Sequence, residues 1–259
     1  MDLASVDTGL LLGVLLAISI GGLIKGITGV GLPIFGVPAL AAITSVEEAV
    51  VLMLFPSISA NLWLVVSHRK YAHSLRQHLP FLLTGFAGAV VGTGLLLVIS
   101  ERGLKLLLAI WLGLYLMHYL INNRSLQWYG ASGKTAYALG LAAGTIQGAT
   151  GISAQIVAPY YHARGLAPET YAFAVAFTFL FFALAQVAAM TNMELLTPSR
   201  FQLSLLALIP TLAFTQLGIS LSRAISHSFF NRILLAVFIL MEMILIRDLI
   251  QGHCGNSCA

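Results

Sequence analysis

Charge and cysteine are both scarce in this 259-residue chain. Only 8% of its residues are charged and 59% are hydrophobic, whereas an ordinary soluble domain has roughly 25% charged residues. This composition excludes a soluble globular domain. Both cysteines, Cys254 and Cys258, lie close to the end of the sequence, so neither a disulfide framework nor an internal thiolate metal site can be built from them.

Concentrated positive charge is missing as well. The 13 basic and 9 acidic residues give a net charge of +4, but the excess is spread along the chain rather than gathered in a Lys/Arg block, and we expect no nucleic-acid partner. The first seven residues, MDLASVD, contain no Lys or Arg and thus lack the basic region of a cleaved signal peptide. We expect the first apolar segment to remain in the mature protein.

Long, nearly charge-free runs occupy most of the sequence, and each reaches or approaches the roughly 20 residues that a helix needs to cross a bilayer. They cover residues 8–46, interrupted only by Lys25, and residues 49–67, 77–100, 106–123, 135–163, 170–193, 201–222 and 233–246, the last interrupted by Glu242. The alternating pattern of a membrane β-barrel is absent. The sequence therefore predicts an all-α polytopic membrane protein.

Two of these runs contain helix breakers. A straight helix over residues 8–43 would be about 54 Å long, which exceeds the hydrocarbon thickness of about 30 Å. The breakers in the first run are Gly26, Gly29, Gly31, Pro33, Gly36 and Pro38, and those in 135–163 are Gly144, Gly148, Gly151 and Pro159. We predict two helical pieces around a broken centre in each run, which either re-enters or crosses twice.

The two broken runs are copies of each other. A shift of 122 residues places GLIKGITG (22–29) on GTIQGATG (144–151), and the identical pairs are Gly22/Gly144, Ile24/Ile146, Gly26/Gly148, Thr28/Thr150 and Gly29/Gly151. The same register pairs Glu47 with Glu169 and, after a short insertion, Gly92 with Gly218. G-x-x-x-G alone is typical of helix packing, but its recurrence beside breakers predicts two homologous halves, 1–125 and 126–250, and a polar tail, 251–259.

An odd number of crossings in each half would invert the second half relative to the first. The positive-inside rule tests this. The inverted arrangement places eight basic residues on one side, Arg69, Lys70, Arg76, Arg124, Lys134, Arg164, Arg223 and Arg232, and four on the other, Arg102, Lys105, Arg200 and Arg247. Unbroken crossings give a split of 7:5. Inversion is favoured, with both termini outside the cytoplasm.

Helix ends inside a membrane offer binding groups to an anion, because the first N–H groups of a helix are unpaired and carry partial positive charge. The predicted substrate-binding residues surround the two breaks: Lys25, Thr28, Gly29, Gly31, Gln147, Thr150, Gly151, Ser153 and Gln155. Lys25 either faces the first break, where an anion would neutralise it, or snorkels to an interface. Asn61 and Gln186 either complete a pocket or form hydrogen bonds between helices.

Three carboxylates are candidates for coupling to a proton or cation. Glu47 and Glu169 stand at matched positions before apolar runs, where the alternative role is to complement a helix dipole. Glu242 either titrates or pairs with Arg247 or with a base on another helix. We predict no metal site and no cofactor, and assign His68, His73 and His78 to a solvated loop that contacts lipid headgroups.

The glycine-rich strings at 22–31 and 144–151, followed by Val37-Pro38 and Ala158-Pro159, resemble the sulfite exporter TauE/SafE family. The resemblance implies a secondary transporter in a bacterial inner membrane that exports sulfite, sulfoacetate or related sulfonates. The second copy departs from the pattern at Ser153, where the first has Gly31. No P-loop, G-x-S-x-G or H-E-x-x-H motif is present, and we expect no enzymatic activity.

Other functions remain open. A passive anion channel would share the broken helices without a coupling ion, small carboxylates would fit an anion site as well as sulfonates, and an accessory subunit would move nothing alone. The expected partners are the lipid bilayer, a small anion and a coupling proton or cation. The faces of small residues would also permit a homodimer.

Overall fold

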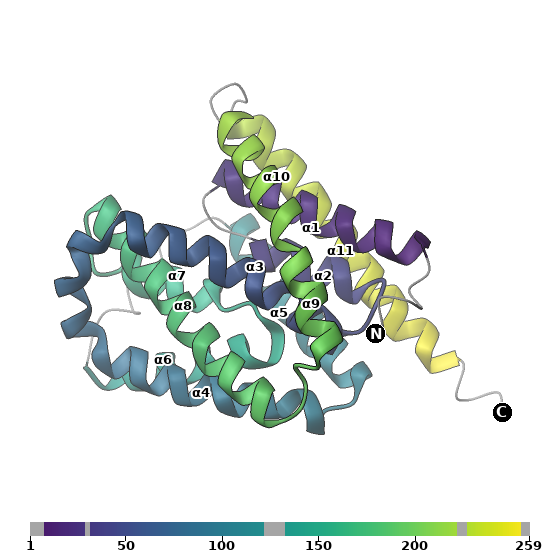
Figure 1. The fold of residues 1–259 in the computed structure, drawn as a ribbon, viewed down its shortest axis with the longest axis horizontal. Coiled ribbons are helices and arrows are strands. Elements are labelled where there is room, and N and C mark those ends of the chain that lie inside the picture. The colour runs from purple at the N-terminus through teal and green to yellow at the C-terminus, as the bar shows by residue number, and fades with distance from the viewer. Residues whose placement is uncertain (1–7, 29–31, 122–132, 222–226, 255–259) are drawn as a thin grey trace. The chain divides into compact units, whose positions relative to one another are not determined.

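The computed structural model describes residues 8–28, 32–121, 133–221 and 227–254, and their regular structure is entirely helical (Figure 1). The elements are α1 (Thr8–Thr28), α2 (Leu32–Ala41), α3 (Val46–Ser67), the 3-10 helix η2 (Arg69–His78), α4 (Leu79–Val98), α5 (Glu101–Ile121), α6 (Gly133–Thr150), α7 (Ala154–His162), α8 (Pro168–Asn192), α9 (Pro198–Leu206), α10 (Leu208–Leu221) and α11 (His227–Cys254). The expected all-α class is confirmed for this part of the chain. Helix α11 continues into the first residues of the predicted tail.

Four helical stretches in the described ranges are long and apolar enough to cross a membrane. They are Val46–Ser67, Arg69–Val98, Pro168–Asn192 and Pro198–Leu221. Shorter apolar helices cover Leu12–Ile27 and Leu32–Ala41, on either side of the first predicted interruption. Together these stretches define a multi-pass membrane protein.

The chain divides into two compact units, and each unit takes segments from both halves of the sequence repeat. Unit 1 comprises Met1–Met53, Ile99–Asn122 and Pro198–Ala259, and unit 2 comprises Leu54–Val98 and Asn123–Thr197. The division falls within α3, after Met53. Segments of the two halves are therefore interleaved in each compact unit.

Helix ends occur at both predicted interruptions. In the first run α1 ends at Thr28 and α2 begins at Leu32; in the second, α6 ends at Thr150 and α7 begins at Ala154. Gly151 has a φ of 69°, a left-handed conformation that suits glycine. Its N–H donates to the carbonyl oxygen of Gln147 at 2.7 Å, which is the bond of a glycine-terminated helix.

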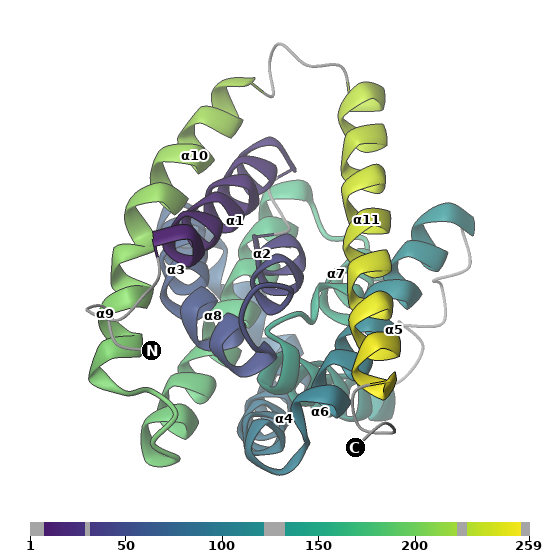
Figure 2. The same ribbon diagram turned by 90° about the vertical axis from the view of Figure 1, so that its right-hand side faces the viewer.

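Unit 1 is built around a close crossing of α1 and α10, which lie side by side (Figures 1 and 2). A Cβ atom on Gly22 would meet the carbonyl oxygen of Thr211 at 2.9 Å, and one on Gly26 would collide with that of Thr215. A Cβ atom on Gly218 would collide with the carbonyl oxygen of Leu23. The backbones therefore approach each other directly, as in small-residue membrane packing.

Unit 2 contains the same crossing between α6 and α4. Gly144 faces the carbonyl oxygen of Gly85, Gly148 faces that of Ala89, and Gly92 faces that of Thr145. The contacting positions correspond to those of unit 1. Each position on α6 lies 122 residues after its counterpart on α1, and each position on α10 lies 126 residues after its counterpart on α4. In each unit, the first helix of one half packs on the fourth membrane helix of the other half.

Gly92→Ala tests the crossing in unit 2. The added methyl group would collide with the backbone of Thr145, so we expect a loss of about 1–3 kcal/mol of stability, as for overpacking in a core. Gly94→Ala is the matched control on the same helix, because its Cβ would meet only Met193 Cε at 3.6 Å. Thermal unfolding in detergent should show a lower Tm for Gly92→Ala alone. Equal Tm values would contradict the close crossing.

Candidate functional site

The polar side chains at the second break bond to one another and to the backbone. Gln147, Thr150 and Ser153 are all buried. Ser153 Oγ donates to Gln147 Oε1 at 2.8 Å. Thr150 Oγ1 donates to the Ile146 carbonyl at 2.7 Å and accepts from the Ile152 N–H at 3.2 Å. The structure thus gathers these predicted residues around Gly151, while Gln155 lies half-buried in the first turn of α7.

Gln186 on α8 completes this arrangement. Its side-chain Nε2 donates to the carbonyl oxygens of Gln147 at 3.3 Å and Gly148 at 3.2 Å, and Gln186 is 1% exposed. These carbonyls belong to the last turns of α6, where a helix end leaves acceptors unpaired. Gln186 therefore serves as the interhelical hydrogen-bond partner that was one of its two predicted roles.

The first break carries a buried cation in unit 1. Lys25 is 9% exposed, and no hydrogen bond or ion pair joins it to any residue among those described. It stands one turn after Gly21, whose Cβ would lie 3.4 Å from the carbonyl oxygen of Leu32. Since residues four apart share a helix face, Lys25 lies on the face of α1 that packs against the first turn of α2. Thr28 ends α1, and its side chain, Gly29 and Gly31 lie outside the described part of the structure.

An alignment of the two copies of the repeat shows that the two breaks contain different residues. The counterparts of Gln147, Ser153 and Gln186 in the first copy are Lys25, Gly31 and Leu64. The first copy thus lacks the amide and hydroxyl groups that form the hydrogen bonds of the second. In their place it has Lys25, on the face of α1 that packs against the first turn of α2.

Glu47 lies in an ion-pair cluster at the start of α3. Arg200 Nη2 lies 2.7 Å from Glu47 Oε1 and 2.7 Å from Glu48 Oε1. The N–H of Glu48 donates to Ser45 Oγ at 3.1 Å, which caps the helix, and Glu101 accepts the N–H of Val46 at 3.0 Å. These contacts fit the structural alternative for Glu47, a carboxylate at a helix start. No pattern in the sequence indicated that Arg200 is the partner of Glu47.

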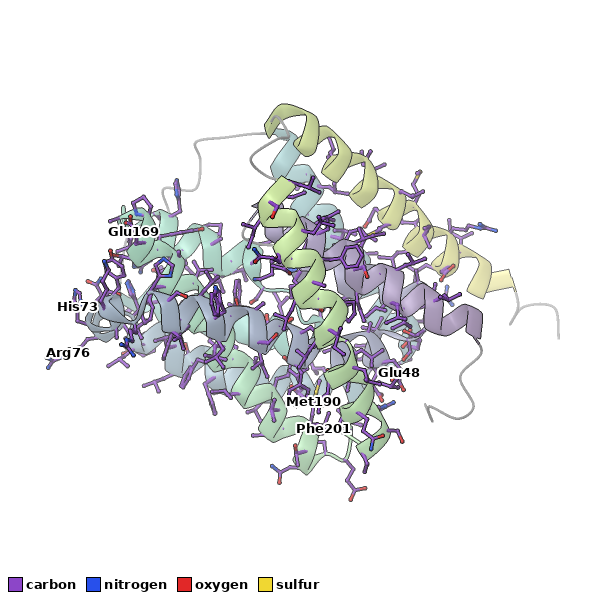
Figure 3. The ribbon with its side chains drawn as sticks, turned by 45° about the horizontal axis from the view of Figure 1, so that its top comes forward. Glu48, His73, Arg76, Glu169, Met190 and Phe201 are labelled. Carbon is purple, nitrogen blue, oxygen red and sulfur yellow. The ribbon has the colours of Figure 1, made fainter. Side chains whose placement is uncertain are left out.

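The other two carboxylates differ in their surroundings. Glu169 lies in the first turn of α8 and is exposed, near His73 and Arg76 at one end of unit 2 (Figure 3). Glu242 on α11 faces Gly113 on α5, whose Cβ would lie 3.3 Å from Glu242 Oε1. Its Oε2 is buried and has no hydrogen-bond partner in the described structure. The described residues include no ion pair between Glu242 and Arg247.

Several basic residues lie together at one end of unit 1. Arg200 pairs with the start of α3, and Glu101 joins that start to α5. Arg102 donates to the Leu249 carbonyl at 3.4 Å, and Lys105 pairs with Asp248 at 3.2 Å, next to Arg247. The four basic residues that the inverted arrangement assigns to one membrane side therefore share one end of unit 1. We call this region the polar end of unit 1.

The prediction of a solvated loop is wrong for His78. The segment forms η2, and His78 is 1% exposed. Its Nδ1 lies 3.5 Å from Tyr160 Oη, and its ring centroid lies 4.9 Å from that of Tyr161. Phe81 stacks on Tyr160 at 3.8 Å between centroids. The polar sequence of this segment did not indicate that His78 belongs to an aromatic cluster, because His78 is buried only by its packing against α7 and α8.

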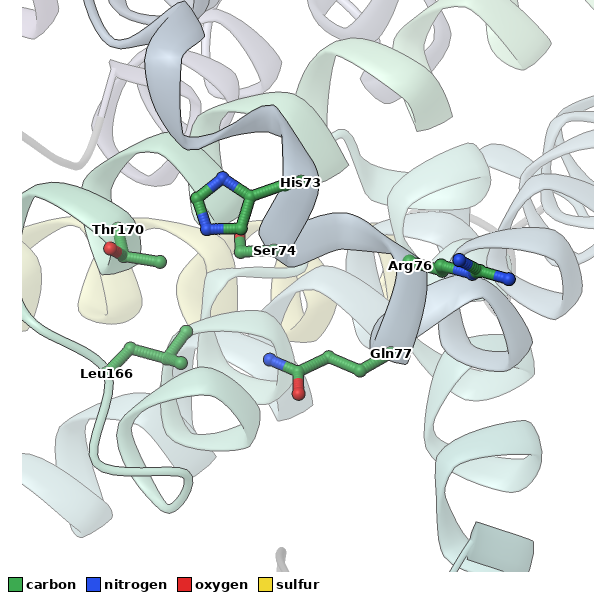
Figure 4. Close-up of a pocket in the computed structure, with 6 residues that line it drawn as sticks. All are labelled: His73, Ser74, Arg76, Gln77, Leu166 and Thr170. Atoms are coloured by element: carbon green, nitrogen blue, oxygen red, sulfur yellow. The ribbon is translucent and has the colours of Figure 1, made fainter.

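An open cleft of about 490 Å³ lies between η2 and the start of α8. It is lined by His73, Ser74, Arg76, Gln77, Leu166 and Thr170 (Figure 4). In this view His73, Ser74 and Gln77 face Leu166 and Thr170, and the Arg76 side chain points away. None of the residues predicted around the breaks lines this cleft. In the ranges that the structure covers, no group of three or more His, Cys, Asp or Glu residues could hold a metal ion.

Several apolar helices long enough to cross a bilayer define a membrane protein. The sequence model of the family described as "Sulfite exporter TauE/SafE" matches residues 14–244. Because this match covers most of the chain, the protein belongs to the sulfite exporter TauE/SafE family, as its glycine-rich strings suggested. Comparison with curated proteins and with solved structures finds no match.

Gln186→Leu tests whether the second break is held by hydrogen bonds. The substitution introduces the residue found at the matched position of the first copy and removes the donor for two buried carbonyls. We expect a loss of about 1–3 kcal/mol, measured as a lower Tm in detergent. Asn192→Leu is the control, since Asn192 is an exposed amide on the same helix that bonds only to Ala188. A similar Tm for both variants would contradict the assigned role.

Proposed function

We propose that the protein is a secondary transporter that exports a small sulfur-containing anion, such as sulfite, sulfoacetate or a related sulfonate, across the bacterial inner membrane. Family membership supports the sulfur-anion class. The anion binds at the first break, where Lys25, Thr28, Gly29 and Gly31 contribute to the site. The second break, with Gln147, Thr150, Gly151, Ser153 and Gln155, has a structural role in this proposal.

This proposal rests on Lys25, which is buried and has no partner among the described residues. A buried ammonium group is costly unless an opposite charge neutralises it. The start of α2 is a second positive source on the same side of α1, so an anion between them would be stabilised by both. A snorkelling lysine would instead extend its ammonium group to the water interface, and the 9% exposure of Lys25 argues against that role.

The length of α2 supports a site near the middle of the membrane. Its ten residues rise about 15 Å, which is roughly half of the hydrocarbon thickness. The end of α2 leads into the start of α3, which belongs to the polar end of unit 1. The first break lies at the other end of α2, so its distance from the polar end is about half of the hydrocarbon thickness. Binding near the midplane is the expected place for a transporter built of repeats.

The repeat supports transport by alternating access. The two halves, 1–125 and 126–250, run in opposite directions through the membrane in this proposal, and the grouping of Arg102, Lys105, Arg200 and Arg247 supports it. The two glycine crossings are packed backbone against backbone, so each moves as a rigid pair of helices. The interrupted segments beside them supply the parts that rearrange.

Lys25→Ala tests the site. A ligand that binds only the folded protein stabilises it by mass action, by about 2.7 kcal/mol at 100 times its Kd. Purified wild-type protein should show a higher Tm with sulfite or sulfoacetate, and Lys25→Ala should lose most of that shift. Lys105→Ala should keep the shift, because Lys105 is paired with Asp248 at the polar end. Equal behaviour of the two variants would overturn the role of Lys25.

The same assay and a flux assay separate the other functions. A shift with acetate but not with sulfonates would redirect the substrate to carboxylates. Saturable flux with counterflow of labelled anion in proteoliposomes would exclude a passive channel. Purified protein that neither binds nor moves any of these anions would contradict the proposal and favour an accessory subunit.

A further inference from the structure

Glu242 lies between helices α5 and α11 and has no role in the helix crossings or in the proposed anion site. The two helices lie side by side in unit 1 (Figure 2). They run antiparallel, because Lys105 contacts Asp248 while Gly113, further along α5, contacts Glu242, which comes earlier on α11. Glu242 is thus six residues from Asp248, about 9 Å along the helix, on the inner side of the polar end.

The described surroundings of Glu242 contain little that could stabilise its charge. Glu242 is half-buried; one carboxylate oxygen faces the bare Cα of Gly113, and the other is buried without a hydrogen-bond partner among the described residues. A proton or a bound cation would stabilise a carboxylate in this condition. By contrast, Glu48 is held by Arg200 at 2.7 Å, and Glu169 is exposed to solvent.

Among the described side chains, the charged and titratable groups on the packed helices do not supply a partner for Glu242. Helix α5 carries Glu101, Arg102 and Lys105 at its polar end, and Lys105 is already paired with Asp248. The side chains of Tyr115, His118 and Tyr119 on α5 and of Arg232 on α11 lie outside the described part. Helix α2, which also contacts α5 and α11, carries no titratable residue. Arg247 on α11 itself is exposed.

We propose that Glu242 is the proton-carrying group of the transporter, taking up a proton at its carboxylate from water at the polar end and releasing it to water in the alternate state. This inference rests on the proposed transport function and assigns its coupling ion. Helix α2 gives the physical connection, since it packs on α1 beside Lys25 and also on both helices of the Glu242 pair. Movement of α2 on anion release would therefore alter the surroundings of both groups.

Carbodiimide labelling of the purified wild-type protein tests the carboxyl group directly. Dicyclohexylcarbodiimide reacts with protonated carboxyl groups in apolar surroundings. Mass spectrometry of peptides should find the adduct on Glu242 at least tenfold more than on ion-paired Glu48 or exposed Glu194, and labelling should fall as pH rises. No adduct on Glu242 between pH 5 and 9 would overturn the proposal, as would protection by sodium ions at constant pH, which would assign a metal cation instead.

Transport by Glu242→Gln tests the coupling. In proteoliposomes, exchange of labelled for unlabelled sulfoacetate needs no net proton movement, so the variant should keep it within about twofold. Accumulation driven by a pH gradient should fall at least tenfold. Glu194→Gln, an exposed residue after α8, should retain both. Unchanged gradient-driven accumulation in Glu242→Gln would overturn the inference. Absence of all sulfoacetate and sulfite flux in the wild type would instead contradict the transport function, and the labelling result would still decide the state of Glu242.

Discussion

The direct backbone contact between glycine-lined helices is the constraint on which the rest of the structure depends. Where Gly26 meets Thr215 in unit 1 and Gly148 meets Ala89 in unit 2, no side chain fits between the helices. Such contacts fix the height and rotation of α1 on α10 and of α6 on α4. They thereby fix where each first helix ends, and both end at the interruptions. Because each crossing joins segments of both halves, neither half forms a compact unit from its own residues.

The two glycine crossings are alike but the two breaks differ, and the proposed function rests on this difference. The amide of Gln147 and the hydroxyl of Ser153 bond to each other in the second copy, and Gln186 bonds to the carbonyls of α6. The first copy has Lys25, Gly31 and Leu64 at these positions. A duplicated scaffold has therefore kept one break as a hydrogen-bonded structural element. The other break has Lys25, which the proposed anion would stabilise.

The sequence predicted the features that depend on local composition and period. Apolar runs predicted helices, and breakers around Gly151 predicted the end of α6. The glycine pattern could not reveal that α1 pairs with α10, because a face of small residues fits any helix that approaches closely. Long-range polar partners were also hidden: Arg200 and Glu48 are 152 residues apart, and His78 is buried by aromatic residues of a distant segment. At the proposed site, the sequence singled out Lys25 but could not show that it is buried and that no described residue pairs with it.

In the proposed transporter, the first break binds the anion and the second does not. The number of anions bound per chain at saturation tests this, by equilibrium dialysis of the purified protein with labelled sulfoacetate or sulfite. We expect one anion per chain in the wild type and none at the same concentration in Lys25→Ala. Two anions per chain, or one that persists in Lys25→Ala, would contradict it.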